Sequence, residues 1–247
     1  MKVAQVCVFL FVVLAQAMSA GIGDPLTAYA SATESLEAGD SETASERYEE
    51  LVDADWHSPE LYHNLGVAYQ RQGNIEAALL QLYRAWLLKP FSSTAKSQFL
   101  SQAKESSLSK TRLHQAETQA AALGWRTPLA LAAVAAFWTS LILIILVKKP
   151  LMRGFGLAGV AIGILLGAAA YYFHQASPSA HAAWVISPEA APLRASHGTG
   201  SPQLTTAPPL TQVDILNQRE DWAYVQRSNG SGGWIEEGSV GKLMPWR

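Results

Sequence analysis

The chain contains one sequence pattern that binds a dinucleotide in other settings. Residues 154–159 read GFGLAG, which matches G-x-G-x-x-G. A dinucleotide site needs a strand before these glycines and an acidic residue about 20 positions after them, to hold the pyrophosphate and the ribose. Here no predicted strand precedes the glycines, no acidic residue follows at that distance, and the pattern opens an apolar run. It therefore indicates close packing of a helix and predicts no cofactor site.

The other side chains capable of chemistry form no catalytic arrangement. There is no GxSxG, no Walker loop and no HExxH spacing among the six histidines. His57 and His63 with Glu60 could bind a metal, although surface histidines of a helical hairpin are the commoner explanation. The single cysteine, Cys7, lies in the N-terminal apolar run, so removal of that run leaves no thiol for a disulfide, zinc site or nucleophile. We expect no catalytic residue, no cofactor and no metal: the protein is predicted not to be an enzyme.

The charge balance excludes one class of partner. Only 15% of the residues are charged, against about 25% in soluble proteins. The net charge of −2 supplies no basic surface, so no nucleic acid is expected. Residues 21–124 hold 14 acidic and 8 basic side chains. This local excess could attract a basic partner segment, but a solvated helical surface is the simpler explanation.

The N-terminus has the layout of a secretory signal peptide. Lys2 is followed by an apolar run over residues 3–14 and then by small residues. We assign the signal to residues 1–20, with cleavage after Ala17 or Ala20. An uncleaved signal anchor is the alternative. In both cases the segment that follows is exported.

Two apolar runs predict a transmembrane hairpin over residues 126–173. The runs, 128–147 and 154–173, carry no charge and are each long enough to span a bilayer. The turn at 148–153 is so short that the two predicted helices must run antiparallel. Its three positive charges predict a cytoplasmic turn, so both folded segments are expected on the periplasmic side of the bacterial cytoplasmic membrane. The absence of ionisable residues from the runs argues against a transporter.

Small residues recur every four positions in both runs, which places them on one face of each helix. Such faces let membrane helices pack closely. We expect packing of the two spans, or of a homodimer, through Gly159, Gly163 and Gly167 on the second run and Ala132, Ala136 and Ser140 on the first.

Residues 25–122 are predicted to be helical and to repeat with a period of 34. Residues 59–92 resemble a tetratricopeptide (TPR) repeat, and residues 25–58 form a weaker copy of it. Residues 93–122 do not match the repeat and are interpreted as capping helices. The positions that match the TPR signature are Leu65, Gly66, Tyr69, Gly73, Ala78, Leu82, Ala85 and Pro90.

The resemblance implies that the first helix of the repeat lines a groove for a partner. The residues expected to bind the partner are Asn64, Tyr69 and Arg71. Arg84, on the second helix, is expected to face outward and to matter less.

A linker over 174–182 leads to short strand-like runs separated by glycine turns. Residues 183–247 resemble a bacterial SH3-like domain, a small all-β barrel. The tryptophans expected to form its core or a ligand surface are Trp184, Trp222 and Trp234. Residues 202–209 are predicted to form a loop before the third strand.

The whole arrangement is a multi-domain membrane protein with all-α TPR hairpins, a two-helix transmembrane hairpin and an SH3-like barrel. It is similar to the BatE-type proteins of bacterial aerotolerance (Bat) operons. That resemblance implies a scaffold that works beside von Willebrand factor A-domain membrane proteins and a MoxR-type ATPase. Two functions stay open: a membrane scaffold for protein partners, and a peptidoglycan-binding or envelope-stress-sensing protein.

Overall fold

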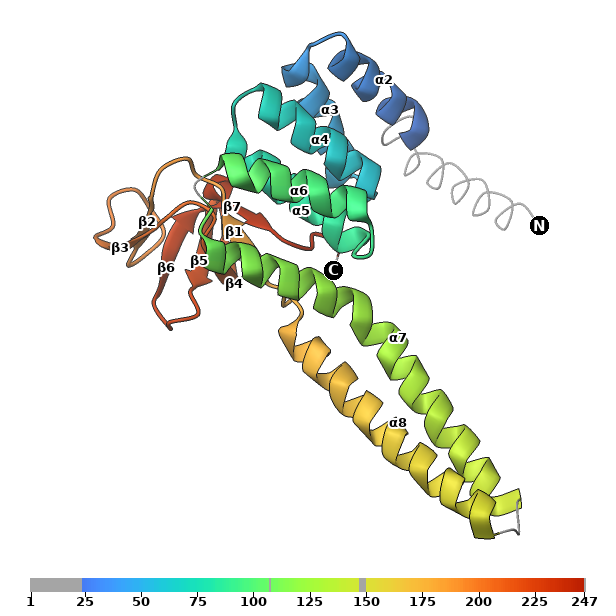
Figure 1. Ribbon diagram of the computed structural model, residues 1–247. Coiled ribbons are helices and arrows are strands. Elements are labelled where there is room, and N and C mark those ends of the chain that lie inside the picture. The colour runs from blue at the N-terminus through green and yellow to red at the C-terminus, as the bar shows by residue number, and fades with distance from the viewer. Residues whose placement is uncertain (1–23, 107, 147–149, 247) are drawn as a thin grey trace, which may run out of the picture.

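The computed structural model describes residues 24–246 except residue 107 and residues 147–149. The predicted signal peptide and part of the predicted cytoplasmic turn lie outside these residues. Figure 1 shows a head, residues 24–106, 108–124 and 177–246, from which a stalk of two long antiparallel helices, residues 125–146 and 150–176, projects. The head combines a helical region with a C-terminal antiparallel sheet, which confirms the coarse prediction of fold class.

Polar N-caps begin the five helices of residues 25–105. These helices are α2 (Pro25–Glu37), α3 (Ser41–Asp53), α4 (Pro59–Arg71), α5 (Ile75–Leu88) and α6 (Ser93–Glu105). Asp24, Ser58 and Ser92 cap α2, α4 and α6, and Asp40 and Asn74 cap α3 and α5. Each cap side chain accepts a hydrogen bond from a backbone N–H of the first turn, which would otherwise lack a partner. The caps therefore recur with the 34-residue period of the sequence.

Glycines make the turns of the pairs α2–α3 and α4–α5, and a glycine allows the close contact within the second of them. Gly39 and Gly73 have φ of +88° and +81°, a left-handed conformation that other residues adopt at a cost. Gly66 on α4 faces α5, where an added Cβ would lie 3.0 Å from Cγ of Leu82 and 3.3 Å from the carbonyl oxygen of Ala78. The absence of a side chain at Gly66 thus lets the two helices approach closely.

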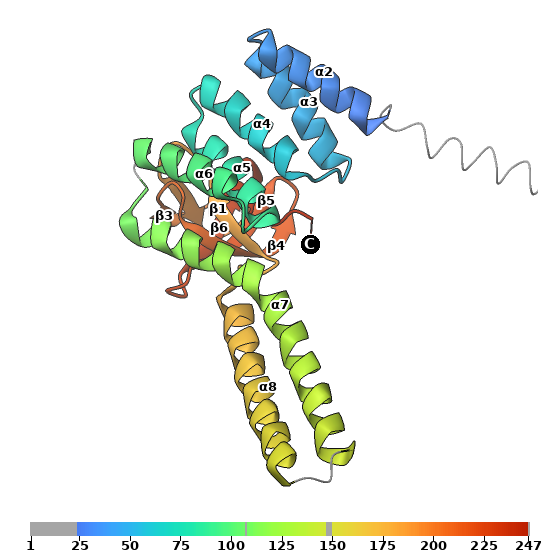
Figure 2. The ribbon, with the colours of Figure 1, turned by 45° about the vertical axis from the view of Figure 1, so that its right-hand side comes forward.

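The helices that follow α5 continue the spacing of the repeat but not its packing. α6 starts 34 positions after α4 and packs on α5, as α4 packs on α3. α7 (Lys110–Leu146) also contacts α5, but α6 and α7 do not pack closely on each other as α4 and α5 do. α7 continues without a break into the stalk. In both ribbon views it runs along the head and then turns downward beside α8 (Pro150–Ala176) (Figures 1 and 2).

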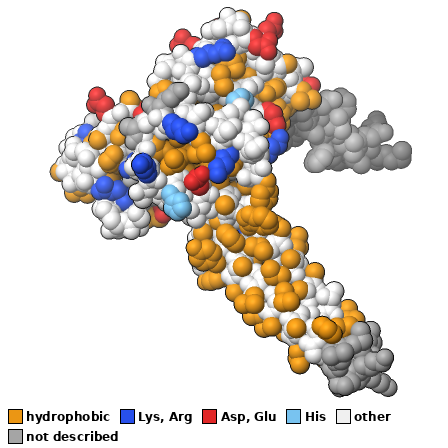
Figure 3. Space-filling view, in the orientation of Figure 1, with side chains coloured by type: hydrophobic (Ala, Val, Ile, Leu, Met, Phe, Trp, Pro, Cys, Tyr) orange, Lys and Arg blue, Asp and Glu red, His pale blue; other side chains and the backbone are white. Residues whose placement is uncertain are grey.

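Both stalk helices are long and apolar enough to cross a membrane, by length and composition. The candidate spans are Lys110–Ile145 and Gly154–Ala176. Hydrophobic side chains cover the visible face of the stalk, whereas charged side chains gather on the head (Figure 3). Many of the stalk's large apolar side chains are exposed, as expected for a surface that faces lipid.

The predicted glycine face of α8 lies toward α7. A Cβ on Gly159 would collide with the side chain of Ser140, and one on Gly163 would lie 3.3 Å from the carbonyl oxygen of Ala133. Gly167 is less crowded, with the Cβ of Ala133 at 4.0 Å. On α7 the sequence pattern named Ala132, but that residue is exposed and its neighbour Ala133 makes the contact.

Seven strands form one antiparallel sheet in the order β3-β2-β6-β5-β4-β1-β7. They are β1 (Ala182–Val185), β2 (Ala191–Arg194), β3 (Gln203–Ala207), β4 (Gln212–Arg219), β5 (Trp222–Gln226), β6 (Gly232–Glu236) and β7 (Val240–Lys242). The prediction of a loop over 202–209 was wrong. Most of that segment is β3, which pairs with β2 through the backbone. Backbone pairing does not require a particular side-chain pattern, so the sequence did not reveal this strand.

Candidate binding surfaces

The sheet and the helices of the head share an apolar core. β1 is buried on both faces: Ala183 and Val185 belong to the core of the sheet, and Ala182 and Trp184 to a cluster with α5, α6 and α7. The Trp184 indole stacks on Tyr83 of α5, with ring centroids 4.7 Å apart and an interplanar angle of 3°. The core of the sheet itself is aliphatic, so Trp184 packs between the two modules.

We call the interface between the helices of the head and the sheet the joint, and Arg84 of α5 makes its central polar contacts. Its side chain is 8% exposed, and Nε and Nη2 donate to the backbone carbonyl oxygen of Lys242 at 2.9 and 2.5 Å. Nη1 donates to Oε1 of Gln81 at 2.9 Å. Burial lowers the pKa of Arg84 to about 10, so the guanidinium stays charged at neutral pH. The expectation of an outward-facing Arg84 was wrong, because β7 covers this face of α5.

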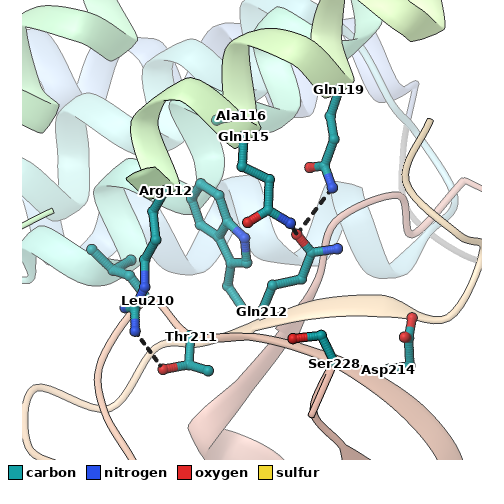
Figure 4. Close-up of a pocket in the computed structure, with 10 residues that line it drawn as sticks. Arg112, Gln115, Ala116, Gln119, Leu210, Thr211, Gln212, Asp214 and Ser228 are labelled. Atoms are coloured by element: carbon teal, nitrogen blue, oxygen red, sulfur yellow. Dashed lines mark hydrogen bonds between the residues drawn. The ribbon is translucent and has the colours of Figure 1, made fainter. Parts of the chain in front are cut away.

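A small cavity of about 240 Å³ lies where α7 meets the sheet. Gln115 and Gln119 of α7 both donate to Oε1 of Gln212, at 2.9 and 3.0 Å (Figure 4). Arg112 donates to Oγ1 of Thr211 at 3.0 Å, also from α7 to the sheet. These polar groups satisfy one another, so the cavity belongs to the joint and is a poor candidate for a ligand site.

A second cavity, of about 310 Å³, opens along α2, α4 and α6. We call it the first-helix groove and define it by Tyr29 of α2, His63 and Asn64 of α4, and Gln98 of α6. Three helices at successive repeat positions thus contribute to one surface. Such a surface can hold an extended or helical segment of another protein.

Asn64 lies at the centre of this groove. Its Nδ2 donates to the hydroxyl oxygens of Tyr29 at 2.9 Å and Tyr48 at 3.2 Å. Tyr48 is fully buried, so Asn64 connects the groove surface to the core of the first pair. Asn64 is the residue among the three predicted partner-binding positions that lines the groove.

His63 is half-buried beside Asn64. Burial lowers the pKa of the His63 imidazole, and the carboxylate of Glu60 opposes that effect. Its Nδ1 is buried and has no hydrogen-bond partner among the described residues, while Nε2 lies 3.4 Å from Nε2 of Gln98. Lys89 and Glu60 form an exposed ion pair at the edge of the groove, with a 2.5 Å separation.

The other two predicted partner-binding residues lie away from the groove. The hydroxyl of Tyr69 donates to a carboxylate oxygen of Glu49 on α3. Nη1 of Arg71 donates to the carbonyl oxygen of Leu36 at the end of α2. Both side chains therefore hold the first pair against the second. The remaining signature residues pack or shape the second pair: Leu65, Gly66, Ala78, Leu82 and Ala85 are buried, and Gly73 and Pro90 lie beyond helix ends.

The other two predicted tryptophans lie outside the aliphatic core of the sheet. Trp222 is 9% exposed. Trp234 is partly exposed and lies with Tyr224 and His197, its ring centroid 5.5 Å from each. We call these three rings the aromatic patch. Its position on the outer side of β5 and β6 leaves it accessible to a ligand.

Sequence reasoning missed Tyr29, His63 and Gln98 as groove residues. A signal was present, because Tyr29 and His63 are 34 positions apart, and so are Asn64 and Gln98. Extending the repeat register into residues 93–105 would have found them. Within the described part of the chain, no group of three or more histidine, cysteine or acidic side chains could hold a metal ion.

Comparison with known proteins identifies the type of the sheet. Residues 189–241 match the family described as the bacterial SH3 domain. No curated protein and no solved structure matches the chain. The C-terminal module is therefore a bacterial SH3 domain, a class that suggests binding to proteins or to the cell wall.

Proposed function

We propose that this chain is a membrane-anchored scaffold that binds a segment of a partner protein in the first-helix groove. The observation that carries the proposal is the groove itself, which is lined by α2, α4 and α6. Binding needs no catalytic group there, only shape and polar side chains. Asn64, Gln98 and His63 supply amide and imidazole groups for a backbone or polar side chain of the partner.

The helical pairs α2–α3 and α4–α5, followed by α6, support an assignment as TPR-type repeats. The starts and caps of these five helices recur at 34 positions, and Gly66 provides the close helix contact expected of the family. In that family the first helices line the binding surface, which agrees with the location of the groove. Such a short array favours modest affinity, and confinement of both partners to one membrane offsets this by raising their effective concentration.

The stalk supports anchoring in the cytoplasmic membrane as a double-pass hairpin. Its exposed apolar side chains would be costly in water and are favourable in lipid. Lys148, Lys149 and Arg153 favour a cytoplasmic turn, which puts the head on the periplasmic side. Reporter fusions after Gly124 and after Arg247 test this topology: activity of a cytoplasmic reporter at either point contradicts it.

The resemblance to BatE-type proteins extends the proposal to a class of complex. It favours a stress or aerotolerance assembly that contains von Willebrand factor A-domain membrane proteins and a MoxR-type ATPase. Affinity purification of the full chain from membranes, followed by mass spectrometry, tests this extension. Recovery of other partners would leave the groove intact as a site and remove the Bat assignment.

Variants in the groove test the scaffold function directly. We expect Gln98→Ala and Asn64→Ala to reduce partner recovery from membranes, and Gln70→Ala to leave it unchanged. Gln70 is the control because it lies on the same helix as Asn64 but is exposed. Asn64→Ala also removes two hydrogen bonds to tyrosines, so Gln98→Ala separates binding from folding. Equal recovery with Gln98→Ala and Gln70→Ala would reject this groove.

The aromatic patch favours a second function, binding of peptidoglycan by the SH3 module. Partly exposed Tyr224 and Trp234, with exposed His197, offer rings on which a sugar or peptide can stack. The test is retention of the purified chain on cell-wall sacculi. Retention lost in Trp234→Ala but kept in Gln98→Ala would assign the cell wall to the patch; no retention of the parent chain would exclude it.

A further inference from the structure

An open apolar cleft lies between the two stalk helices just below the head. It has a volume of about 610 Å³ and lies between the early stalk part of α7 and the end of α8. Leu131 and Val134 of α7 and Ala170 of α8 line its lower part. Leu131 and Val134 are 66% and 57% exposed, so this part opens sideways from the stalk. The volume is in the range of about 300–1,000 Å³ that is usual for sites that hold small molecules.

The upper end of the cavity is polar and positively charged. Arg126 lies there on α7, and His174 lies opposite it on α8. Among the described residues, Arg126 forms no hydrogen bond or ion pair with another side chain. α8 contains no acidic residue, and the nearest acidic residue before Arg126 on α7 is Glu117. The guanidinium therefore faces the cavity mouth without a protein counter-charge.

The length of the cavity discriminates between two occupants. Arg126 and Val134 are eight positions apart on one helix, which corresponds to about 12 Å along its axis. One leaflet of the hydrocarbon core is about 15 Å deep, half of roughly 30 Å. A transmembrane helix of a partner would need contact along the full depth. The cavity instead matches one acyl chain that runs into a single leaflet, with its head group at the mouth.

We propose that this cavity binds one phospholipid with an anionic head group. The acyl chain lies against Leu131, Val134 and Ala170, and the phosphate accepts hydrogen bonds from the guanidinium of Arg126 and the imidazole of His174. A guanidinium suits this role because its planar N–H groups match phosphate oxygens in pairs. The inference rests on the proposed membrane anchoring of the stalk. It adds a lipid partner that neither the groove nor the aromatic patch requires.

The test uses the full chain purified in detergent and titrated with phosphatidylglycerol or phosphatidylcholine. Native mass spectrometry counts the lipid molecules that stay bound. We expect one retained phosphatidylglycerol, and phosphatidylcholine bound at least about tenfold more weakly. Both phosphates can accept a hydrogen bond from Arg126, but the trimethylammonium group of phosphatidylcholine brings a second positive charge beside the guanidinium, whereas phosphatidylglycerol keeps a net negative head group. Arg126→Gln should remove the preference. Lys110→Gln, an equal charge change at the exposed start of the same helix, should keep it.

A second variant tests the apolar part of the cavity. Ala130 lines it and is exposed, so Ala130→Trp should fill the space and displace the lipid while Arg126 is retained. Equal retention of both lipids by the parent chain, or a preference unchanged in Arg126→Gln, overturns the proposal. A polypeptide that co-purifies at one-to-one ratio and is released by Ala130→Trp overturns it in favour of a protein occupant.

Alkaline extraction of membranes keeps this proposal separate from the anchoring on which it rests. A chain that is released by carbonate contradicts the proposed anchoring and removes the lipid site with it. A chain that stays in the membrane but shows no lipid preference contradicts the lipid site alone.

Discussion

Removal of the Trp184 indole should separate the SH3 module from the helices without unfolding the SH3 module. Trp184 is 4% exposed and stacks on Tyr83, but the aliphatic core of the sheet does not include it. Truncation of a buried aromatic residue to alanine costs about 3–5 kcal/mol. The polar cavity beside Trp184 can admit water to the space, so we expect the lower value, about 3 kcal/mol. That corresponds to a roughly 150-fold shift of the docking equilibrium.

A buried thiol can report this separation in the full chain. Leu80 of α5 is 1% exposed and contacts Gly241 of β7, so Leu80→Cys in a Cys7→Ser background places the only thiol in the joint. Trp184→Ala should raise its rate of alkylation in detergent by about 100-fold, whereas Trp234→Ala, at the aromatic patch, should not. Equal alkylation rates in the two variants would show that the joint does not depend on the indole.

Three further perturbations test the head and the stalk. Arg84→Ala should lower the free energy of unfolding by roughly 2 kcal/mol, because the partly buried carbonyl oxygen of Lys242 loses its charged donor. Chemical denaturation measures this, and an unchanged midpoint contradicts it. Gly159→Leu should lower the stability of the folded chain by about 1–3 kcal/mol, because the larger side chain collides with α7. Gly154→Leu should not, because the space around Gly154 is open. Thermal unfolding in detergent compares the two variants. The lowered pKa of His63 means that the unfolded chain binds a proton more readily than the folded chain, so the free energy of unfolding should fall as the pH drops below about 6.5. In His63→Gln the free energy of unfolding should depend less on pH in this range. An equally steep dependence in the variant would exclude His63 as its source.

Local features of the head were predictable because each is encoded within a few residues. Polar caps, turn glycines and the 34-residue spacing mark where the helices begin, and the two apolar runs mark the stalk. Residues 93–122 were predicted only as capping helices, because the 34-residue shift places Ser107 beneath Gly39 and Gly73 and the glycine that marks the turn is missing there. The sequence therefore indicated the repeat only where a glycine occupies the turn between the two helices.

The joint between the modules was not predictable from local pattern. β1 shows no alternation of polar and apolar residues, since both of its faces are buried, and the same Ala-Ala-Trp-Val run would suit an ordinary core strand. Arg84 looks like a solvated helical residue until Lys242, 158 positions away, supplies its acceptor. Such contacts depend on how two completed modules meet, which neither helical nor strand periodicity describes.

The unbroken course of α7 has a mechanical consequence. This helix has 37 residues, a length of about 55 Å along its curved axis, and it contains Pro128 near the start of the stalk. Its first turns are part of the joint, through Ala116 and Ala120, and its last turns pack on α8. The return connection, from Ala176 to Ala182, is short as well. If the stalk spans a bilayer as proposed, the head is joined to the membrane by a continuous helix rather than by a flexible linker. The first-helix groove then stays close to the membrane surface, and Pro128 is the position at which α7 can bend. A partner anchored in the same membrane would meet the groove only if its own segment reaches the head.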